Sequence, residues 1–250
     1  MSIQRKISSI LSSYNDLIEN NTRRIQILEE MCQRIYREWF VDFRFPGHKE
    51  IDLVDSEMGK IPEGWEVKLL GKEITIVRGK NLTKQKMEDG LIPVISAGIS
   101  PSGFHSVSNV KAPVVTISAS GANAGYIGFH MNDIWASDCS FFNSDSTEFI
   151  FFYYLSLLDR QVEVTNMQRG AAQPHVYPKD LMELKIIVPS ENLIKSFDEI
   201  AGSFFKLIGN LKSKNENLKK SRDLLLPRLI SGEIDVSELD IELKEEVNVA

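Results

Sequence analysis

The segment from Gln168 to Tyr177 carries side chains suited to reading nucleic-acid bases. It places amides, a guanidinium, an imidazole and a phenol in one polar stretch. Arginine can pair with guanine edges and glutamine with adenine edges in the DNA major groove. Polar loops also occur without such a role, so both interpretations stay open at this point. The residues that could contact bases or the groove here are Gln168, Arg169, Gln173, His175 and Tyr177.

A short basic cluster could hold phosphates beside such a loop. It consists of Arg78, Lys80, Lys84 and Lys86. Lysine and arginine contacts to phosphates position a protein on a duplex without reading its sequence. Residues 62–190, however, carry 11 basic against 13 acidic side chains, and the net charge of the chain is −6. Any affinity for DNA would therefore be local and strongly dependent on salt.

The glycine-rich segment 118–128 follows a run of β-branched residues and superficially suggests a nucleotide-binding loop. It lacks the lysine and Ser/Thr of a P-loop, and no dinucleotide fingerprint can be built around it. Ser120 does not lie in a GxSxG elbow. Two interpretations remain, a tight turn or close contact with an extended polar ligand, for which Ser120 and Asn123 are the candidates.

The remaining residues that could do chemistry form no recognised catalytic or metal-binding pattern. The four histidines are scattered, and His130 with Asp133 and Asp138 lacks a known ligand spacing. The two cysteines form no CxxC motif, which predicts a reducing compartment and thus the cytoplasm. The apolar run 149–158 is too short to span a bilayer, so we expect a buried helix and no membrane association.

Two apolar stripes with alternating spacings of three and four residues flank the middle of the chain, and they superimpose at a constant offset of 190. Such spacing over about four heptads predicts a coiled-coil seam, so each helix needs a partner. The first stripe consists of Leu11, Tyr14, Ile18, Asn21, Ile25, Leu28, Cys32, Ile35 and Trp39. The second consists of Ala201, Phe204, Ile208, Leu211, Asn215, Leu218, Arg222, Leu225 and Leu229.

One asparagine interrupts each stripe, Asn21 in the first and Asn215 in the second. A buried amide at a seam position can fix the register of a coiled coil or the choice of partner. Simple exposure to solvent is the alternative interpretation, and both remain open.

The order of elements predicts an α+β protein in which one mixed domain is flanked by two long coiled-coil helices. We expect strands near residues 65–70, 74–77, 91–95, 113–117 and 184–188. Pro189 and Ser190 should precede the second helix, and Pro227 and Gly232 should end it. The predicted boundaries are 1–43 for the first helix, 44–61 for a linker, 62–190 for the mixed domain, 191–231 for the second helix and 232–250 for an acidic tail.

Several runs resemble the specificity subunits of type I restriction-modification systems. Residues 10–31 and the run Tyr36-Arg-Glu-Trp-Phe-Val-Asp-Phe-Arg-Phe-Pro-Gly47 resemble the central conserved region of that family. Gly59-Lys-Ile-Pro-Glu-Gly-Trp65 looks like the start of a target recognition domain, and residues 221–234 look like the distal conserved region. Residues 115–140 and 169–181 are also similar to such domains, so the resemblance covers nearly the whole chain.

This resemblance implies a non-catalytic, DNA-reading subunit. It would dock methyltransferase subunits along its helices and, with motor subunits added, direct adenine methylation and restriction of double-stranded DNA. S-adenosylmethionine and ATP would belong to those partners, so no cofactor is expected on this chain. Family members carry two recognition domains, whereas this sequence holds one, which implies pairing with a second copy or with another half-subunit.

Two other functions compete with this one. A coiled-coil adaptor without DNA binding would be favoured if residues 78–86 and 168–177 lay on opposite faces. A stand-alone hydrolase would require Ser120 or His130 to line a deep pocket with a base or a metal at bonding distance.

Overall fold

The computed structural model describes residues 3–170 and 173–239, which form two compact units. One unit combines the described residues of Met1–Glu30 and Phe204–Ala250, and the other is Met31–Ser203. Long helices and short strands occur together, which confirms the predicted α+β class. Residues 1–2, and residues 240–250 of the predicted acidic tail, lie outside the described residues.

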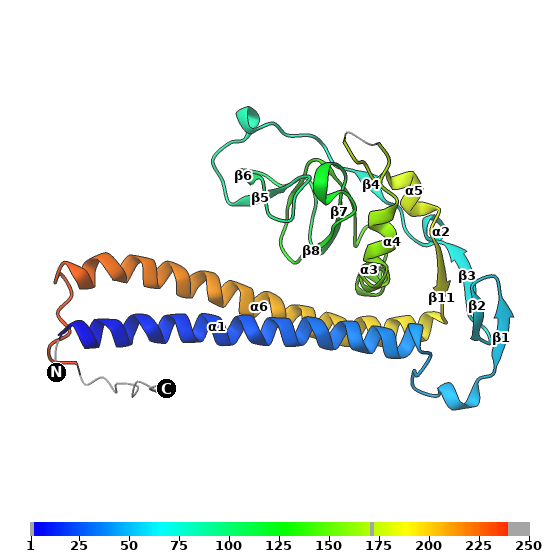
Figure 1. Ribbon diagram of the computed structural model, residues 1–250, viewed down its shortest axis with the longest axis horizontal. Coiled ribbons are helices and arrows are strands. Elements are labelled where there is room, and N and C mark those ends of the chain that lie inside the picture. Colours follow the sequence, from blue (N-terminus) through cyan, green and yellow to red (C-terminus); the bar gives the residue numbers. More distant parts are fainter. Residues whose placement is uncertain (1–2, 171–172, 240–250) are drawn as a thin grey trace. The chain divides into compact units, whose positions relative to one another are not determined.

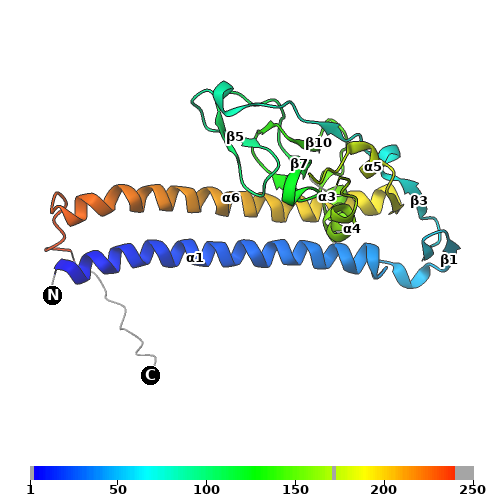
Figure 2. The same cartoon turned by 45° about the horizontal axis from the view of Figure 1, so that its top comes forward.

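The first unit is an antiparallel pair of helices. They belong to α1 (Ile3–Tyr36) and α6 (Glu191–Ile230), which lie side by side in both Figure 1 and Figure 2. Their opposite directions follow from two contacts: Arg222 Nη1 donates to Asn15 Oδ1 at 2.8 Å, and Lys212 Nζ donates to Glu29 Oε1 at 3.1 Å. The two stripes therefore supply each other's partner within one chain.

The seam follows the heptad positions. Within this unit, the stripe positions Ile25, Ile208, Leu211, Asn215 and Leu229 are buried, and the other stripe positions are half-buried. One position differs from the prediction, because Phe205 is buried while Phe204 is only half-buried. An apolar stripe on a helix is wide enough to include both residues, so heptad spacing alone does not choose between them.

The two asparagines that interrupt the stripes meet at the seam. Asn21 Nδ2 donates to Asn215 Oδ1 at 2.9 Å. Asn215 Nδ2 donates to the Ile18 carbonyl and to Thr22 Oγ1, both at 3.2 Å. Because Asn215 is buried and these bonds form at only one alignment of the helices, the arrangement favours the register interpretation over simple exposure.

In the second unit, α1 ends in a π-helical turn, Arg37–Val41, that points Phe40 into an aromatic cluster. The ring of Phe40 lies 5.0 Å from Phe152 and 5.0 Å from Phe197 of α6. Its other ring neighbours are Tyr36 at 5.3 Å, Trp65 at 6.0 Å and Trp39 at 6.1 Å. The last turn of α1 and the first turns of α6 thus contribute to the core of this unit.

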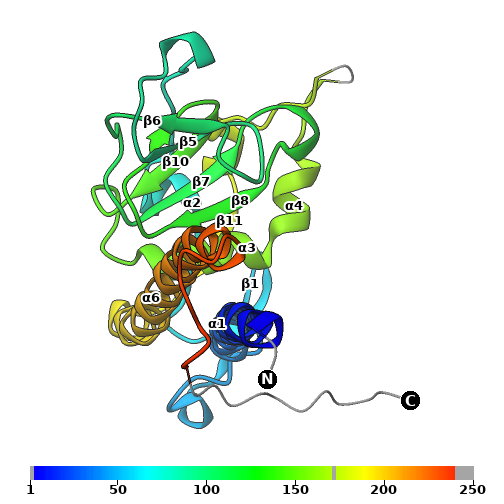
Figure 3. The ribbon, with the colours of Figure 1, turned by 90° about the vertical axis from the view of Figure 1, so that its left-hand side faces the viewer.

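The sheets of the second unit are small and mostly antiparallel (Figure 3). The largest has the order β4 (Val77–Arg78), β10 (Cys139–Asn143), β7 (Val114–Ser118) and β8 (Ile127–His130). The next has the order β6 (Gly103–His105), β5 (Ile92–Ile95) and β9 (Trp135–Ala136), in which β5 and β9 are parallel. Two-stranded pairs join β3 (Glu66–Leu69) to β11 (Lys185–Val188), and β1 (Leu53–Ser56) to β2 (Gly59–Pro62).

Short helices complete this unit. They are α2 (Leu70–Glu73), α3 (Ile150–Asp159), α4 (Gln161–Asn166) and α5 (Pro178–Met182). Helix α3 is the apolar run expected to form a buried helix: Phe152 and Tyr153 are buried, and the Tyr154 ring lies 4.8 Å from Phe129 of β8. Among the described residues, no helix is long and apolar enough to cross a membrane.

The predicted linker 44–61 is structured. It contains a 3-10 turn at His48–Glu50 and the hairpin β1–β2, whose turn has Gly59 at φ +94°. Ile61 is buried, so the segment packs as part of the unit Met31–Ser203, which is wider than the predicted domain 62–190. The sequence did not reveal this hairpin, because most of its positions are exposed and only the end of β2 is buried.

Two further element boundaries differ from the prediction. The predicted strand 74–77 is reduced to β4, although Ile74 and Ile76 are buried. Pro227 lies inside α6, which continues to Ile230 and ends before Gly232 at φ +76°. Proline removes one backbone donor but leaves its own carbonyl free to accept, here from the Ser231 amide at 2.9 Å, so a last turn can follow it.

Asp198 of α6 provides a test of the packing between α6 and α3. Its Oδ1 accepts the Phe152 amide at 2.9 Å, and burial raises its pKa to about 6, against the lowering effect of bonds from the Phe152 and Phe151 amides. The unfolded pKa is about 3.9, so the contribution of Asp198 to stability is fully present below pH 4 and is lost as the pH rises through 6. Asp198→Asn, which does not ionise, should abolish this loss, worth on the order of 1 to 3 kcal/mol.

The measurement is denaturant unfolding of both proteins between pH 4 and pH 8, with the exposed neighbour Glu199→Gln as the control. The free-energy difference between wild type and Asp198→Asn should grow with pH, whereas Glu199→Gln should run parallel to wild type. Parallel curves for all three proteins would contradict the assignment.

Candidate nucleic-acid interface

The glycine-rich segment and the segment 168–177 lie side by side in the structure. The Gly121 amide donates to the Pro174 carbonyl at 3.0 Å, and the Val176 amide donates to the Ala119 carbonyl at 3.1 Å. Between these bonds, Ser120 and His175 form an antiparallel bridge. The two polar segments that the sequence singled out therefore make one surface, termed here the paired loops (residues 118–126, 168–170 and 173–177).

The glycine-rich part of the paired loops is a tight turn that joins β7 to β8. It contains a 3-10 turn at Gly121–Asn123 and Gly125 at φ +86°, a conformation that suits glycine. Gln161 of α4 holds it from the side, because its Nε2 donates to the Gly125 carbonyl at 2.8 Å and its Oε1 accepts the Ile127 amide at 3.1 Å.

The other part of the paired loops is closed by reciprocal bonds between Arg169 and His175. Each amide donates to the other residue's carbonyl at 2.9 Å, and Gly170 has φ +96°. The His175 ring stacks on Tyr177 at 5.9 Å, and Tyr177 is 48% exposed. An imidazole and a phenol are thus presented together on a fixed backbone.

Asp138, just before β10, connects the paired loops to the basic cluster. One carboxylate oxygen pairs with the guanidinium of Arg78 on β4, and the other accepts the hydroxyl of Ser120. Ser120 in turn bridges to His175, so Arg78 and the segment 168–177 are joined through Asp138 and Ser120. This arrangement does not match the opposite faces that would have favoured the adaptor.

The lysines of the basic cluster are exposed, and their backbone is held. The Lys80 amide donates to the Ala136 carbonyl at 2.9 Å, and the Lys80 carbonyl accepts Trp135 Nε1 at 2.9 Å. Lys84 and Lys86 lie in a 3-10 turn. Within the part of the chain that the structure describes, no carboxylate pairs with these three lysines.

Several predicted contact residues have internal partners. Gln168 Nε2 donates to the Ala124 carbonyl at 2.8 Å. Asn123 is half-buried, and its backbone carbonyl accepts the Tyr126 amide at 3.0 Å in the turn. Arg169 Nη2 pairs with Asp180 of α5 at 2.6 Å. Gln173, by contrast, is exposed. Because an amide or guanidinium already bonded must exchange its partner to read a base, Gln173, His175 and Tyr177 are the more accessible side chains for contact.

Sequence reasoning missed the residues that organise this surface: Asp138, Asp180 and Gln161. Each is an isolated polar residue whose partner lies elsewhere in the chain. Asp138 and Arg78 are 60 positions apart, and Gln161 and Gly125 are 36 positions apart. No local spacing marks such residues. The only signal was Asp138 as part of a metal hypothesis, and the structure gives that carboxylate other partners.

The groups that catalysis or metal binding would need lie in separate networks. His130 Nε2 bonds to Thr116 Oγ1 at 2.9 Å, while Lys111 holds Asp133 and lowers its pKa. Burial raises the pKa of the Cys139 thiol to about 12, so it stays protonated at neutral pH. No cluster of three or more His, Cys, Asp or Glu side chains occurs among residues 3–170 and 173–239.

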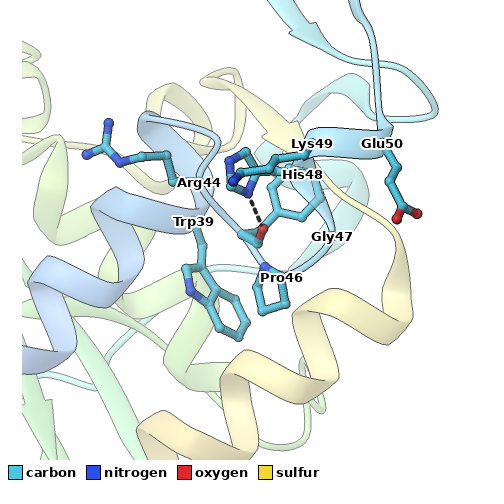
Figure 4. A pocket seen from close by; sticks show the side chains of 8 residues that line it. Trp39, Arg44, Pro46, Gly47, His48, Lys49 and Glu50 are labelled. Carbon is cyan, nitrogen blue, oxygen red and sulfur yellow. Dashed lines mark hydrogen bonds between the residues drawn. The ribbon is translucent and has the colours of Figure 1, made fainter.

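A concavity of about 490 Å³ lies elsewhere, around the end of α1 (Figure 4). Neither Ser120 nor His130 lines it, so it does not provide the pocket that the hydrolase would require. His48 Nδ1 lies 2.8 Å from the Phe45 carbonyl beneath it. Its lining residues are Trp39, Arg44, Phe45, Pro46, Gly47, His48, Lys49 and Glu50.

Comparisons with known proteins agree on one family. The model of the type I restriction modification DNA specificity domain matches residues 62–222. The MjaIX specificity subunit of Methanocaldococcus jannaschii is 29% identical over 94% of this chain and 60% of its own length. The HindI specificity subunit of Haemophilus influenzae is 24% identical over 92% of this chain and 67% of its own length.

A solved structure shows the same fold. The type I restriction-modification S subunit from M. genitalium matches with a TM-score of 0.67 and 22% identity, over 91% of this chain and 60% of that one. The chain spans between 57% and 67% of the length of the curated relatives it matches.

A substitution at Gly79 tests the position of the basic cluster next to β9 and β10. A Cβ at this position would overlap the Ser137 carbonyl oxygen and lie 2.7 Å from the Ala136 carbonyl oxygen. Gly79→Ala should therefore force β4 away from β9 and β10 and lower the free energy of unfolding by about 1 to 3 kcal/mol. The control is Gly98→Ala, whose nearest contact would be ordinary at 3.5 Å and which should change stability by less than about 1 kcal/mol. Equal thermal unfolding curves for the two variants would contradict this placement.

Proposed function

The chain belongs to the type I restriction modification DNA specificity family, and on this premise we propose that it reads DNA sequence for a type I restriction-modification complex. The observation that carries the proposal is the surface formed by the paired loops beside Lys80, Lys84 and Lys86, which have no carboxylate partner among the described residues. Side chains with bonding groups left over, such as Gln173 and Tyr177, would contact base edges, while the lysines would hold phosphates.

The long helices would bind the other subunits. Leu224 and Ile230 of α6 are each 71% exposed, and their apolar side chains leave surface that a partner subunit would cover. We propose that methyltransferase subunits dock on these helices and that restriction or motor subunits join them, in the cytoplasm where the DNA is.

Chemistry would then reside in the partners. S-adenosylmethionine for adenine methylation and ATP for restriction would bind to them, and this chain would need no cofactor and perform no catalysis of its own. Neither Ser120 nor His130 lines the concavity around residues 39–50, which supports this division.

A bipartite DNA site requires two recognition domains, and the described residues contain one. We propose that a second copy of this chain or another half-subunit supplies the other. Two copies related by a twofold axis would read a palindromic bipartite site, because symmetric proteins match symmetric half-sites.

The first test is co-expression of this chain with a cognate methyltransferase subunit, purification of the complex and sequencing of methylated adenines in the host DNA. The expected result is a stable complex and a two-part motif with a fixed gap. A palindromic motif would indicate two copies of this chain. If no complex forms and no adenine is methylated above the level in cells lacking this chain, the proposal is wrong and the adaptor is favoured.

The phosphate contacts are tested by replacing Lys84 and Lys86 together with glutamine. Binding to all duplex sequences should weaken, and the slope of log K against log salt should fall by about 0.9 for each phosphate that is no longer neutralised. The measurement is the affinity of the complex for a labelled duplex across a potassium chloride series. The control replaces Lys111 and Lys185, which pair with Asp133 and Glu57, and so removes the same total charge. If both double variants behave alike, residues 84–86 do not contact phosphates.

A further inference from the structure

The two carboxylate oxygens of Asp138 bond to two different groups of the proposed DNA-reading surface. One oxygen holds the Arg78 guanidinium and the other accepts the Ser120 hydroxyl. These groups come from β4 and from the paired loops, which lie far apart along the chain. A single side chain thus fixes the distance between a cation and a loop that both belong to the proposed DNA-reading surface.

The backbone around Asp138 is itself held in place. Its carbonyl oxygen accepts the Ala119 amide at 3.4 Å, and the neighbouring Cys139 carbonyl accepts the Gly79 amide at 2.8 Å. The carboxylate is therefore presented from a position tied to both partners' segments, and side chains supported in this way hold a productive geometry more narrowly than free ones.

The ion pair between Asp138 and Arg78 also sets the net charge around the Arg78 guanidinium. The Arg78 side chain is 41% exposed, so it can reach a ligand, yet its charge is balanced by the adjacent carboxylate. Lys80, Lys84 and Lys86 have no such partner among the described residues. Arg78 is thus a directed donor with little net attraction for any anion, whereas the lysines attract every phosphate alike.

We propose that Asp138 is a positioning residue for sequence discrimination: anchored on the buried Ser120 hydroxyl of the paired loops, it aims the Arg78 guanidinium at the DNA and suppresses sequence-independent attraction by Arg78. The inference rests on the proposed function. It adds that one residue, Asp138, favours sequence discrimination while limiting sequence-independent affinity for DNA. Asp138 itself need not touch DNA.

The matched control is Asp133. It also carries a single ion pair, with Lys111, and an additional bond, from the Ala112 amide at 3.0 Å. Its side chain is 33% exposed and that of Asp138 is 31% exposed. Asp133→Asn and Asp138→Asn therefore remove the same charge from similar environments, but only Asp138 contacts the paired loops.

The experiment uses the full chain in complex with its methyltransferase subunit and two probes. A duplex library with randomised positions reports sequence preference, and poly(dI-dC) reports sequence-independent binding, each across a salt series. In Asp138→Asn the amide can still accept the Ser120 hydroxyl, but Arg78 is released. Discrimination should fall about tenfold, the size of effect expected when one base pair is no longer read. Affinity for poly(dI-dC) should rise, and its salt slope should steepen by about 0.9.

A double-mutant cycle separates positioning from a merely structural effect. In an Arg78→Met background, Asp138→Asn should no longer change the salt slope, because the cation that it releases is absent. Ser120→Ala, which keeps the ion pair, should lower discrimination without changing the slope, and it tests the hydroxyl half of the proposal if Asp138→Asn does not fold.

The outcomes distinguish the inference from the function on which it rests. If the wild-type complex shows no sequence preference, the proposed function is wrong and the inference falls with it. If wild type discriminates and Asp138→Asn behaves like Asp133→Asn in both discrimination and salt slope, the inference alone is overturned. Unchanged discrimination in Ser120→Ala would overturn its hydroxyl half.

Discussion

The packing of rings around Phe40 is the constraint on which the second unit depends. Five aromatic rings surround this side chain, and they come from the end of α1, from α3, from α6 and from Trp65 at the start of β3. Each aromatic pair adds about 0.5 to 1.5 kcal/mol beyond the area that it buries. Because the rings come from all of these elements, none of them can complete its core alone. The π-helical turn Arg37–Val41 departs from regular α-helix geometry and directs Phe40 inward.

The parts of this fold that the sequence predicts well are those with a regular period and enough length. Alternating spacings of three and four residues over nine positions identify the seam of α1 and α6, and the runs at β7 and β11 are rich in β-branched residues. Strand β10 was missed because both of its faces are largely buried, so Cys139–Asn143 shows no alternation of polar and apolar residues. The hairpin β1–β2 was missed for the opposite reason, since nearly all of it is exposed.

For the candidate site, the sequence predicts which residue types are present but not which residues pair with one another. Local composition identifies the loop that contains His175 and Tyr177 and the lysines that precede β5. It does not show that Arg169 pairs with Asp180 or that Arg78 pairs with Asp138, because the fold brings these partners together from separate positions. Pairing changes the chemistry more than residue type does: an arginine beside a carboxylate is a directed donor, and a lysine without one is a general anion contact.

Net charge alone would argue against the proposed DNA binding, but the pairing of charges weakens that argument. Residues 62–190 contain 11 cations, of which six pair with carboxylates: Lys68, Arg78, Lys111, Arg160, Arg169 and Lys185. Three of the other five lie within the seven-residue stretch 80–86. At physiological ionic strength, charges more than about 8 Å away are largely screened. A phosphate near this stretch would therefore experience the local lysines more strongly than the distant acidic side chains of the chain.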